Sequence, residues 1–230
     1  MAGTWTFAEF KSYLKLQMGK RADVEDYDGV NLYETWINMA YIRLTTRDRF
    51  FAIKANFTFP QLEVLDSSQT TSDGVQYISV PSDCMVVRDL YDYTNKRYIE
   101  GISWREYLKY TDRFDTSAED EATEWVRAGN YLYLHPTPDS NTDAIYVYYR
   151  KIPAVLTGTS ATVLDPAWDE PILQLALIIG KTWLKEYEEA DQMKKEWLDN
   201  VSGMMGIYKQ EELASGKDMK PELVDGGYKE

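Results

Sequence analysis

The spacing between apolar side chains changes twice along the sequence. Up to about residue 50, apolar positions recur every three or four residues, which is the period of an amphipathic helix. From about Phe57 they alternate with polar positions, as in strands, and near Asp165 the helical period returns. The sequence therefore predicts an α+β fold: N- and C-terminal helices form a bundle, and an antiparallel β domain is inserted between them.

The change of period also sets the predicted domain boundaries. N-terminal helices of the bundle occupy residues 1–55, and the β domain with one short helix occupies residues 56–160. C-terminal helices occupy residues 161–210, and an extended tail occupies residues 211–230.

The first segment contains two predicted helices. Thr6 and Glu9 have the spacing of a capping box, which satisfies amides at a helix start, and Gly19 is a suitable terminator. The second helix follows a turn that ends in Asp28-Gly29 and runs to about Arg47. Helical spacing places one set of apolar side chains on a single face of each helix. These are Phe7, Phe10 and Leu14 in the first, and Tyr33, Trp36, Ile37, Ala40, Tyr41 and Leu44 in the second.

The predicted β domain is rich in aromatic and β-branched residues between turn signals. These segments predict an antiparallel sheet of five or six strands, as a small sandwich or open barrel. The strand candidates are Phe57 to Phe59, Tyr77 to Val80, Met85 to Tyr93, Lys96 to Glu100, Trp125 to Arg127, Tyr131 to Leu134 and Tyr146 to Tyr149.

Three connections in this domain carry local signals. Ser103 and Glu106 form a second capping box, which predicts a short helix with Tyr107 and Leu108 on its buried side. The segment from Thr111 to Glu121 is polar and predicts an exposed loop. Ala128-Gly129-Asn130 predicts a tight hairpin, because Gly and Asn tolerate positive φ.

The C-terminal part returns to helix at Asp165-Pro166, an N-cap followed by proline at the first helical position. A polar turn from Glu188 to Asp191 separates two predicted helices, which the short connection makes antiparallel. Their apolar positions are Ile172, Leu173, Ala176, Ile179, Trp183 and Tyr187, then Met193, Trp197, Val201, Met204, Met205 and Tyr208. Five side chains on these stripes and the second N-terminal helix are predicted to be buried: Trp36, Ile37, Ile172, Ile179 and Trp183.

Beyond Gln210 the sequence is rich in glycine, lysine and acidic residues. Such a segment buries too little apolar surface to order itself, but it can order against a partner. Its few apolar side chains are therefore the predicted contacts with a partner protein or with neighbouring subunits: Leu213, Met219, Leu223, Val224 and Tyr228.

Charge and composition exclude several classes of function. The net charge of −13 disfavours a surface that grips duplex DNA or an anionic membrane, since both need clustered Lys and Arg. One cysteine, Cys84, leaves no intrachain disulfide. The first ten residues lack the pattern of a secretory signal, and the apolar run from Ile172 to Ile179 is too short to span a bilayer. The sequence thus predicts a soluble product that is intracellular when made.

Candidate chemistry is sparse. Gly180-Lys181-Thr182 resembles the end of a phosphate-binding loop, but Leu175 stands where the pattern needs glycine, and the segment lies within a predicted helix. The sequence has one histidine, His135, and one cysteine. Zinc sites of the usual composition need more of these residues, so they cannot form. The sequence predicts no metal, no cofactor and no catalytic residue, and hence no enzyme.

Two further patterns are partial matches. Asp26-Tyr27-Asp28-Gly29 resembles part of a calcium loop, but Val24 and Thr35 would occupy its first and last ligand positions. Asp120, Glu121 and Glu124 are typical of a solvated loop, although paired carboxylates can also serve a glycosidase.

The ordered set of segments resembles the head-to-tail adaptor, or connector, proteins of tailed bacteriophages. The likeness spans about residues 5 to 208, and no single motif in it is diagnostic. It rests on five stretches: Trp36 to Tyr41, Gln76 to Asp83, Asn130 to Pro138, Tyr148 to Pro153, and the helix pair from Trp168 to Trp197.

This resemblance implies a structural protein of the virion that has no active site. It implies a homo-oligomeric ring of twelve copies beneath the portal protein, made in the host cytoplasm before assembly. The ring would extend the channel for double-stranded DNA, without sequence-specific binding or membrane contact, and dock a tail or nozzle protein. The negative charge fits a channel wall that repels phosphate, and it fits simple solubility equally well.

A hypothesis from another class is a carbohydrate- or peptide-binding β module on a helical base, with a carboxylate-based hydrolase activity. The abundance of aromatic residues, which include eighteen tyrosines, favours it, since such rings can stack on sugars.

Overall fold

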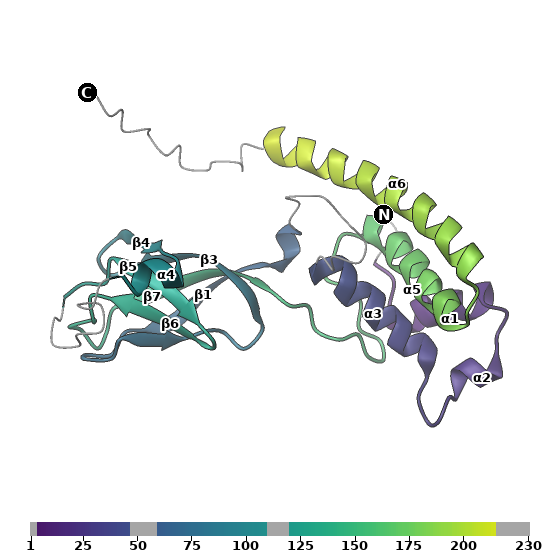
Figure 1. The fold of residues 1–230 in the computed structure, drawn as a ribbon, viewed down its shortest axis with the longest axis horizontal. Helices are drawn as coiled ribbons and strands as arrows, with labels where there is room; N and C mark the ends of the chain where they lie inside the picture. Colours follow the sequence, from purple (N-terminus) through teal and green to yellow (C-terminus); the bar gives the residue numbers. More distant parts are fainter. Residues whose placement is uncertain (1–3, 47–58, 110–119, 215–230) are drawn as a thin grey trace. The chain divides into compact units, whose positions relative to one another are not determined.

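The computed structural model describes residues 4–46, 59–109 and 120–214. The chain forms two compact units (Figure 1): Met1–Thr58 with Val155–Glu230, called here the helical unit, and Phe59–Ala154, called the β unit. Both helices and a sheet are present, so the α+β class predicted from the sequence is confirmed.

The helical unit is built around α5, Asp169–Trp183, which packs against α1, Phe7–Gln17, against α3, Leu32–Thr46, and against α6, Tyr187–Ala214. One short helix, α2 at Ala22–Glu25, leads into α3. Helices from both ends of the sequence thus share one apolar core (Figure 1). Its largest buried side chains include Phe10, Leu14, Tyr33, Trp36, Ile37, Tyr41, Leu44, Trp168 and Trp197.

Local signals explain where these helices begin and end. The Thr6 hydroxyl accepts the Glu9 amide, and the Glu9 carboxylate accepts the Thr6 amide, which confirms the first capping box. Gly19 follows α1 with φ of +76°, a conformation that favours glycine. Asp165 caps a short 3₁₀ helix, Pro166–Trp168, and α5 begins directly after it.

Two predictions for the C-terminal helices are wrong. The turn between them lies at residues 184–186 rather than from Glu188 to Asp191, because α6 already begins at Tyr187. Lys185 adopts φ of +66° there, so a non-glycine residue makes the reversal. The last helix also continues past Gln210 to Ala214. The residues at its end are mostly polar, so a prediction that relies on the spacing of apolar residues misses this part of the helix.

The β unit contains a seven-stranded sheet in the order β1-β7-β3-β4-β5-β6-β2. The strands are β1 at Glu63–Thr70, β2 at Tyr77–Ser79, β3 at Cys84–Asp92, β4 at Arg97–Gly101, β5 at Glu124–Ala128, β6 at Tyr131–His135 and β7 at Ala144–Lys151. A 3₁₀ helix, Pro60–Leu62, precedes β1, and α4, Trp104–Tyr107, follows β4.

The sheet is mixed rather than antiparallel, because β4 and β5 pair in parallel. The chain between them includes α4, and a crossover of this kind allows two strands to run in the same direction. The other pairs are antiparallel, and the β5–β6 hairpin turns at Gly129, as its sequence predicts. The sheet also has more strands than the five or six predicted.

Smaller predictions for the β unit are confirmed only in part. The Ser103 hydroxyl accepts the Glu106 amide at the start of α4, and Tyr107 is buried, but Leu108 is half exposed. Phe59 precedes the 3₁₀ helix instead of ending a strand. Phe57 and Thr58, and most of the loop predicted from Thr111 to Glu121, lie outside the described residues.

One face of the sheet forms a core of its own, in which Leu90, Leu132, Leu134 and Val147 are fully buried. Near its margin the Tyr149 hydroxyl donates to an Asp83 carboxylate oxygen at 2.8 Å. Desolvation raises the pKa of Tyr149, and this hydrogen bond raises it further.

Candidate functional site

The segment Gly180-Lys181-Thr182 belongs to the packing of α5, as its helical context predicts. A Cβ at Gly180 would stand 2.8 Å from the Trp36 ring, so the glycine permits close contact between α5 and α3. The Lys181 ammonium contacts the Glu186 and Glu189 carboxylates at 3.1 and 2.7 Å. The Thr182 hydroxyl donates to the Ile178 carbonyl at 2.8 Å. All three residues therefore serve the fold.

The acidic positions considered for hydrolysis do not form an isolated carboxylate pair. The Glu121 carboxylate contacts the Arg97 guanidinium at 2.7 Å, and Asp120 accepts the Glu121 amide. Among the described residues, no group of three or more His, Cys, Asp or Glu side chains is arranged to hold a metal ion. His135 is half-buried at the end of β6.

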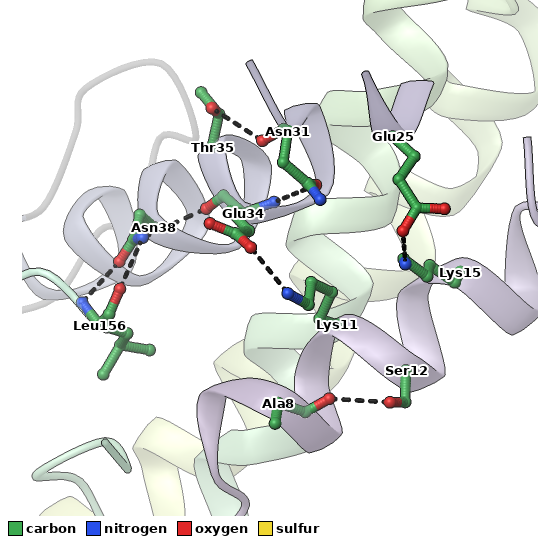
Figure 2. Close-up of polar contacts among 10 residues, drawn as sticks. All are labelled: Ala8, Lys11, Ser12, Lys15, Glu25, Asn31, Glu34, Thr35, Asn38 and Leu156. Atoms are coloured by element: carbon green, nitrogen blue, oxygen red, sulfur yellow. Dashed lines mark hydrogen bonds and ion pairs between the residues drawn. The ribbon is translucent and has the colours of Figure 1, made fainter. Parts of the chain in front are cut away.

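A groove of about 820 Å³ lies in the helical unit between α1, α3 and residues 155–158. Lys11 of α1 contacts Glu34 of α3 at 2.7 Å across it (Figure 2). One turn further along α3, the Asn38 carboxamide forms hydrogen bonds with both the amide and the carbonyl of Leu156. Val30 and Val155 add exposed apolar surface, so the groove combines opposite charges with apolar walls.

A second surface of the helical unit carries aromatic rings. Trp183 was predicted to be buried, but 44% of its surface is exposed, and that prediction is wrong. Its ring stacks at an angle against Trp36 and edge-on against Tyr27, with centroids 5.9 and 5.1 Å apart. Trp183 is the last residue of α5, and the chain turns directly after it at residues 184–186. The other four predicted core residues, Trp36, Ile37, Ile172 and Ile179, are buried.

The β unit has an aromatic surface on the side of the sheet opposite its core. A depression of about 380 Å³ opens there on β1, β3, β4 and β7. We call this surface the tyrosine face; its residues are Leu65, Asp89, Tyr91, Tyr98, Tyr146 and Tyr148. Tyr98 is the most exposed of the four rings, at 76%. The sequence shows that the strands are rich in tyrosine, but only strand register shows which rings share a face.

A separate aromatic cluster lies on β2, β6 and α4. Tyr77 packs against Tyr131 and Tyr133, with ring centroids 4.8 and 5.9 Å apart. Trp104 contacts Tyr133 and stacks on Tyr107. Tyr77, Tyr131 and Trp104 remain partly exposed, so both clusters give the β unit apolar contact surface.

Exposed aromatic surface of this kind is typical of contact sites for other molecules. The family model described as SU10 adaptor protein matches residues 5–219, which is nearly the whole chain. The chain belongs to this family. It is a bacteriophage head-to-tail adaptor, a structural component of the virion, and membership of an adaptor family implies interaction with phage portal and tail proteins. The comparison with curated proteins gave no match to this adaptor.

In the adaptor, the predicted tail contacts fall into two groups. Leu213 lies within α6, so the predicted start of the tail at residue 211 is four residues too early. Met219, Leu223, Val224 and Tyr228 lie outside the described residues. The family match extends into this segment, as far as residue 219. None of the adaptor's described helices has the length and apolar character needed to cross a membrane.

Proposed function

We propose that the adaptor assembles as a ring of twelve copies beneath the portal, extends the DNA channel and docks a tail or nozzle protein. The observation that carries this proposal is the family match over residues 5–219. Each copy is made in the host cytoplasm and joins the virion when a portal is present. The helical unit makes the ring body, and the β unit is the inserted domain that reaches neighbouring subunits.

Two features of the molecule support this arrangement. Helices α1 and α3 pack with α5 in one core, and that core provides a rigid body for a ring. The β unit exposes two aromatic clusters, and aromatic side chains are enriched in protein interfaces.

The charge of the chain is compatible with a channel. A net charge of −13 repels phosphate, so duplex DNA slides through the ring without sequence-specific binding.

The C-terminal segment is the proposed docking element of the adaptor. Leu213, Met219, Leu223, Val224 and Tyr228 act as spaced anchors on the portal or a neighbouring subunit. The segment loses conformational entropy when it becomes ordered. It therefore docks only where contacts with the partner offset that loss.

Assembly with purified portal rings tests the ring. Electron microscopy of the mixture is expected to show added density beneath the portal with twelvefold symmetry. An adaptor that stays unbound at micromolar concentration, or binds in another copy number, contradicts the corresponding part of the proposal.

Truncation after Ala214 removes four of the five proposed anchors and leaves α6 and Leu213 in place. The shortened protein and the double variant Leu223→Ser, Val224→Ser are expected to lose portal binding. The matched control, Asp218→Ser with Glu222→Ser, changes polar neighbours and should bind as wild type does. Normal binding by the truncated protein contradicts the role given to the tail.

A further inference from the structure

The tyrosine face is assembled by strand register. Tyr91 of β3 lies opposite Tyr146 of β7 on one side and opposite Tyr98 of β4 on the other. Tyr148 lies opposite Leu65 of β1. Residues directly opposite each other point to the same side of a sheet. Four strands therefore present their rings and one leucine to the same side.

A β-bulge places a carboxylate among these rings. Val87 pairs with Tyr149, but the next pair along β3 is Asp89 with Tyr148, so one extra residue, Arg88, is accommodated between them. Without it, Asp89 would follow Val87 onto the core side of the sheet, since residues two apart share a side. The bulge turns Asp89 outwards beside Tyr148, which is a recognised effect of bulges on side-chain direction.

Neighbouring rings hold several of the tyrosines in place, and the Asp89 carboxylate lies beside them. The Tyr91 and Tyr98 rings meet edge-on at 5.0 Å, and the Tyr146 ring is held by parallel stacking on Tyr93 at 4.8 Å. Among the described residues, Asp89 makes no side-chain hydrogen bond or ion pair, whereas Asp66 and Asp92 nearby are engaged by neighbouring side chains. Aromatic rings in fixed positions therefore lie beside the Asp89 carboxylate, which has no polar side-chain partner among the described residues.

We propose that the tyrosine face binds a lysine or arginine side chain from a basic segment of a different protein of the virion. A cation over a tyrosine ring is attracted by the electrons of the ring face, and the Asp89 carboxylate adds a direct charge partner. The depression of about 380 Å³ accommodates a single side chain of this size.

The charge of the face itself favours a basic partner. Asp89 is the one charged residue among the described residues that line the depression, so a positively charged side chain is attracted there. The inference deepens the proposed function by giving the chemistry of one partner surface. Its test uses the purified adaptor alone, so its failure would leave ring assembly on the portal unaffected.

The test is a titration of the full-length protein labelled with fluorotyrosine and followed by fluorine NMR. Tyr→Phe variants assign the signals of the four rings. The probes are N-acetylarginine methylamide and its neutral isostere, N-acetylcitrulline methylamide. The arginine probe is expected to shift the signals of Tyr98 and Tyr148 at millimolar concentration, and the citrulline probe to leave them unchanged.

Three variants make the result specific. Asp89→Asn removes the charge at constant shape and is expected to weaken arginine binding about fivefold. Tyr98→Leu alters a highly exposed ring and should weaken it similarly. The matched control, Tyr131→Leu, alters a ring in the other cluster and should bind as wild type does.

Other outcomes overturn the inference. Equal shifts from both probes, or an unchanged affinity in Asp89→Asn, would contradict recognition of a cation. A response to maltose but not to the arginine probe would assign the face to carbohydrate. Loss of self-association in Asp89→Asn, measured by sedimentation, would replace the basic partner with a second copy of the chain.

Discussion

The side chain of Asn38 pairs with the backbone of Leu156, 118 residues later in the sequence (Figure 2). The Leu156 amide donates to the Asn38 carboxamide oxygen at 2.7 Å, and the carboxamide nitrogen donates to the Leu156 carbonyl at 3.1 Å. The same nitrogen also reaches the Glu34 carbonyl, one turn earlier in α3. One side chain therefore attaches the returning chain to the helix, in the manner of a neighbouring strand.

Asn38→Ala should lower the free energy of unfolding by about 1–3 kcal/mol, because both backbone groups of Leu156 lose a partner in a partly buried place. Urea unfolding measures the change. Thr35→Ala is the matched control on the same helix: its hydroxyl only returns to the Asn31 carbonyl, and a loss below about 0.5 kcal/mol is expected. Equal losses in the two variants would contradict a special role for Asn38.

Gly180→Ala should destabilise the protein by about 1–3 kcal/mol, since the new methyl group meets the buried Trp36 ring at 2.8 Å. Gly203→Ala is the matched control in α6, where a Cβ meets nothing within 4 Å. Alanine has the higher helix propensity, so this variant should gain up to about 1 kcal/mol. Thermal unfolding compares them, and a gain in both would show that α5 can move away from α3.

Asp169 should make stability fall as pH rises. The residue is 2% exposed, and it accepts the Trp5 amide at 2.7 Å and the Thr162 hydroxyl at 3.3 Å. Desolvation raises its pKa above the ordinary value of 3.8. The folded protein thus holds this proton more tightly than the unfolded chain does. Its contribution to stability is therefore complete below the ordinary value and is lost as pH rises through the raised pKa.

Asp169→Asn is expected to remove this part of the pH dependence, because the amide oxygen still accepts the Trp5 amide but carries no charge. Urea unfolding between pH 3.5 and 7 measures the slope. The exposed Asp191→Asn is the control and should retain the wild-type profile. A wild-type profile in Asp169→Asn would show that burial of this carboxyl does not govern the slope.

Trp183→Ala should cost about 1–2 kcal/mol, less than the 3–5 kcal/mol expected for a fully buried tryptophan. The ring is 44% exposed and contacts only part of the core through Trp36 and Tyr27. Trp36→Ala provides the comparison, since Trp36 is 2% exposed. Calorimetric melting of both variants tests the order; a larger loss for Trp183→Ala would contradict it.

Features set by near neighbours in the sequence could be predicted. The Thr6 capping box, the Ser103 cap and the turn at Gly129 each depend on a few consecutive residues, and all are present. The apolar stripes also predicted the buried residues of α3 and most of those of α5. Periodicity predicts buried residues in these helices because the apolar face of a helix is buried against the core, whichever element it packs against.

Features that depend on distant partners came only from the tertiary structure. Nothing near Trp183 in the sequence shows that the chain turns away and leaves its ring partly exposed. Nothing near Asp89 shows that a bulge at Arg88 turns its carboxylate towards the tyrosines, because register is a property of two strands. The parallel pairing of β4 with β5 likewise depends on where the crossover returns. The sequence by itself determined the order of the helical and β parts and the buried sides of most of the long helices, since propensity and periodicity are local. The tertiary structure decided which side chains meet, since packing and strand register join residues that lie far apart in the chain.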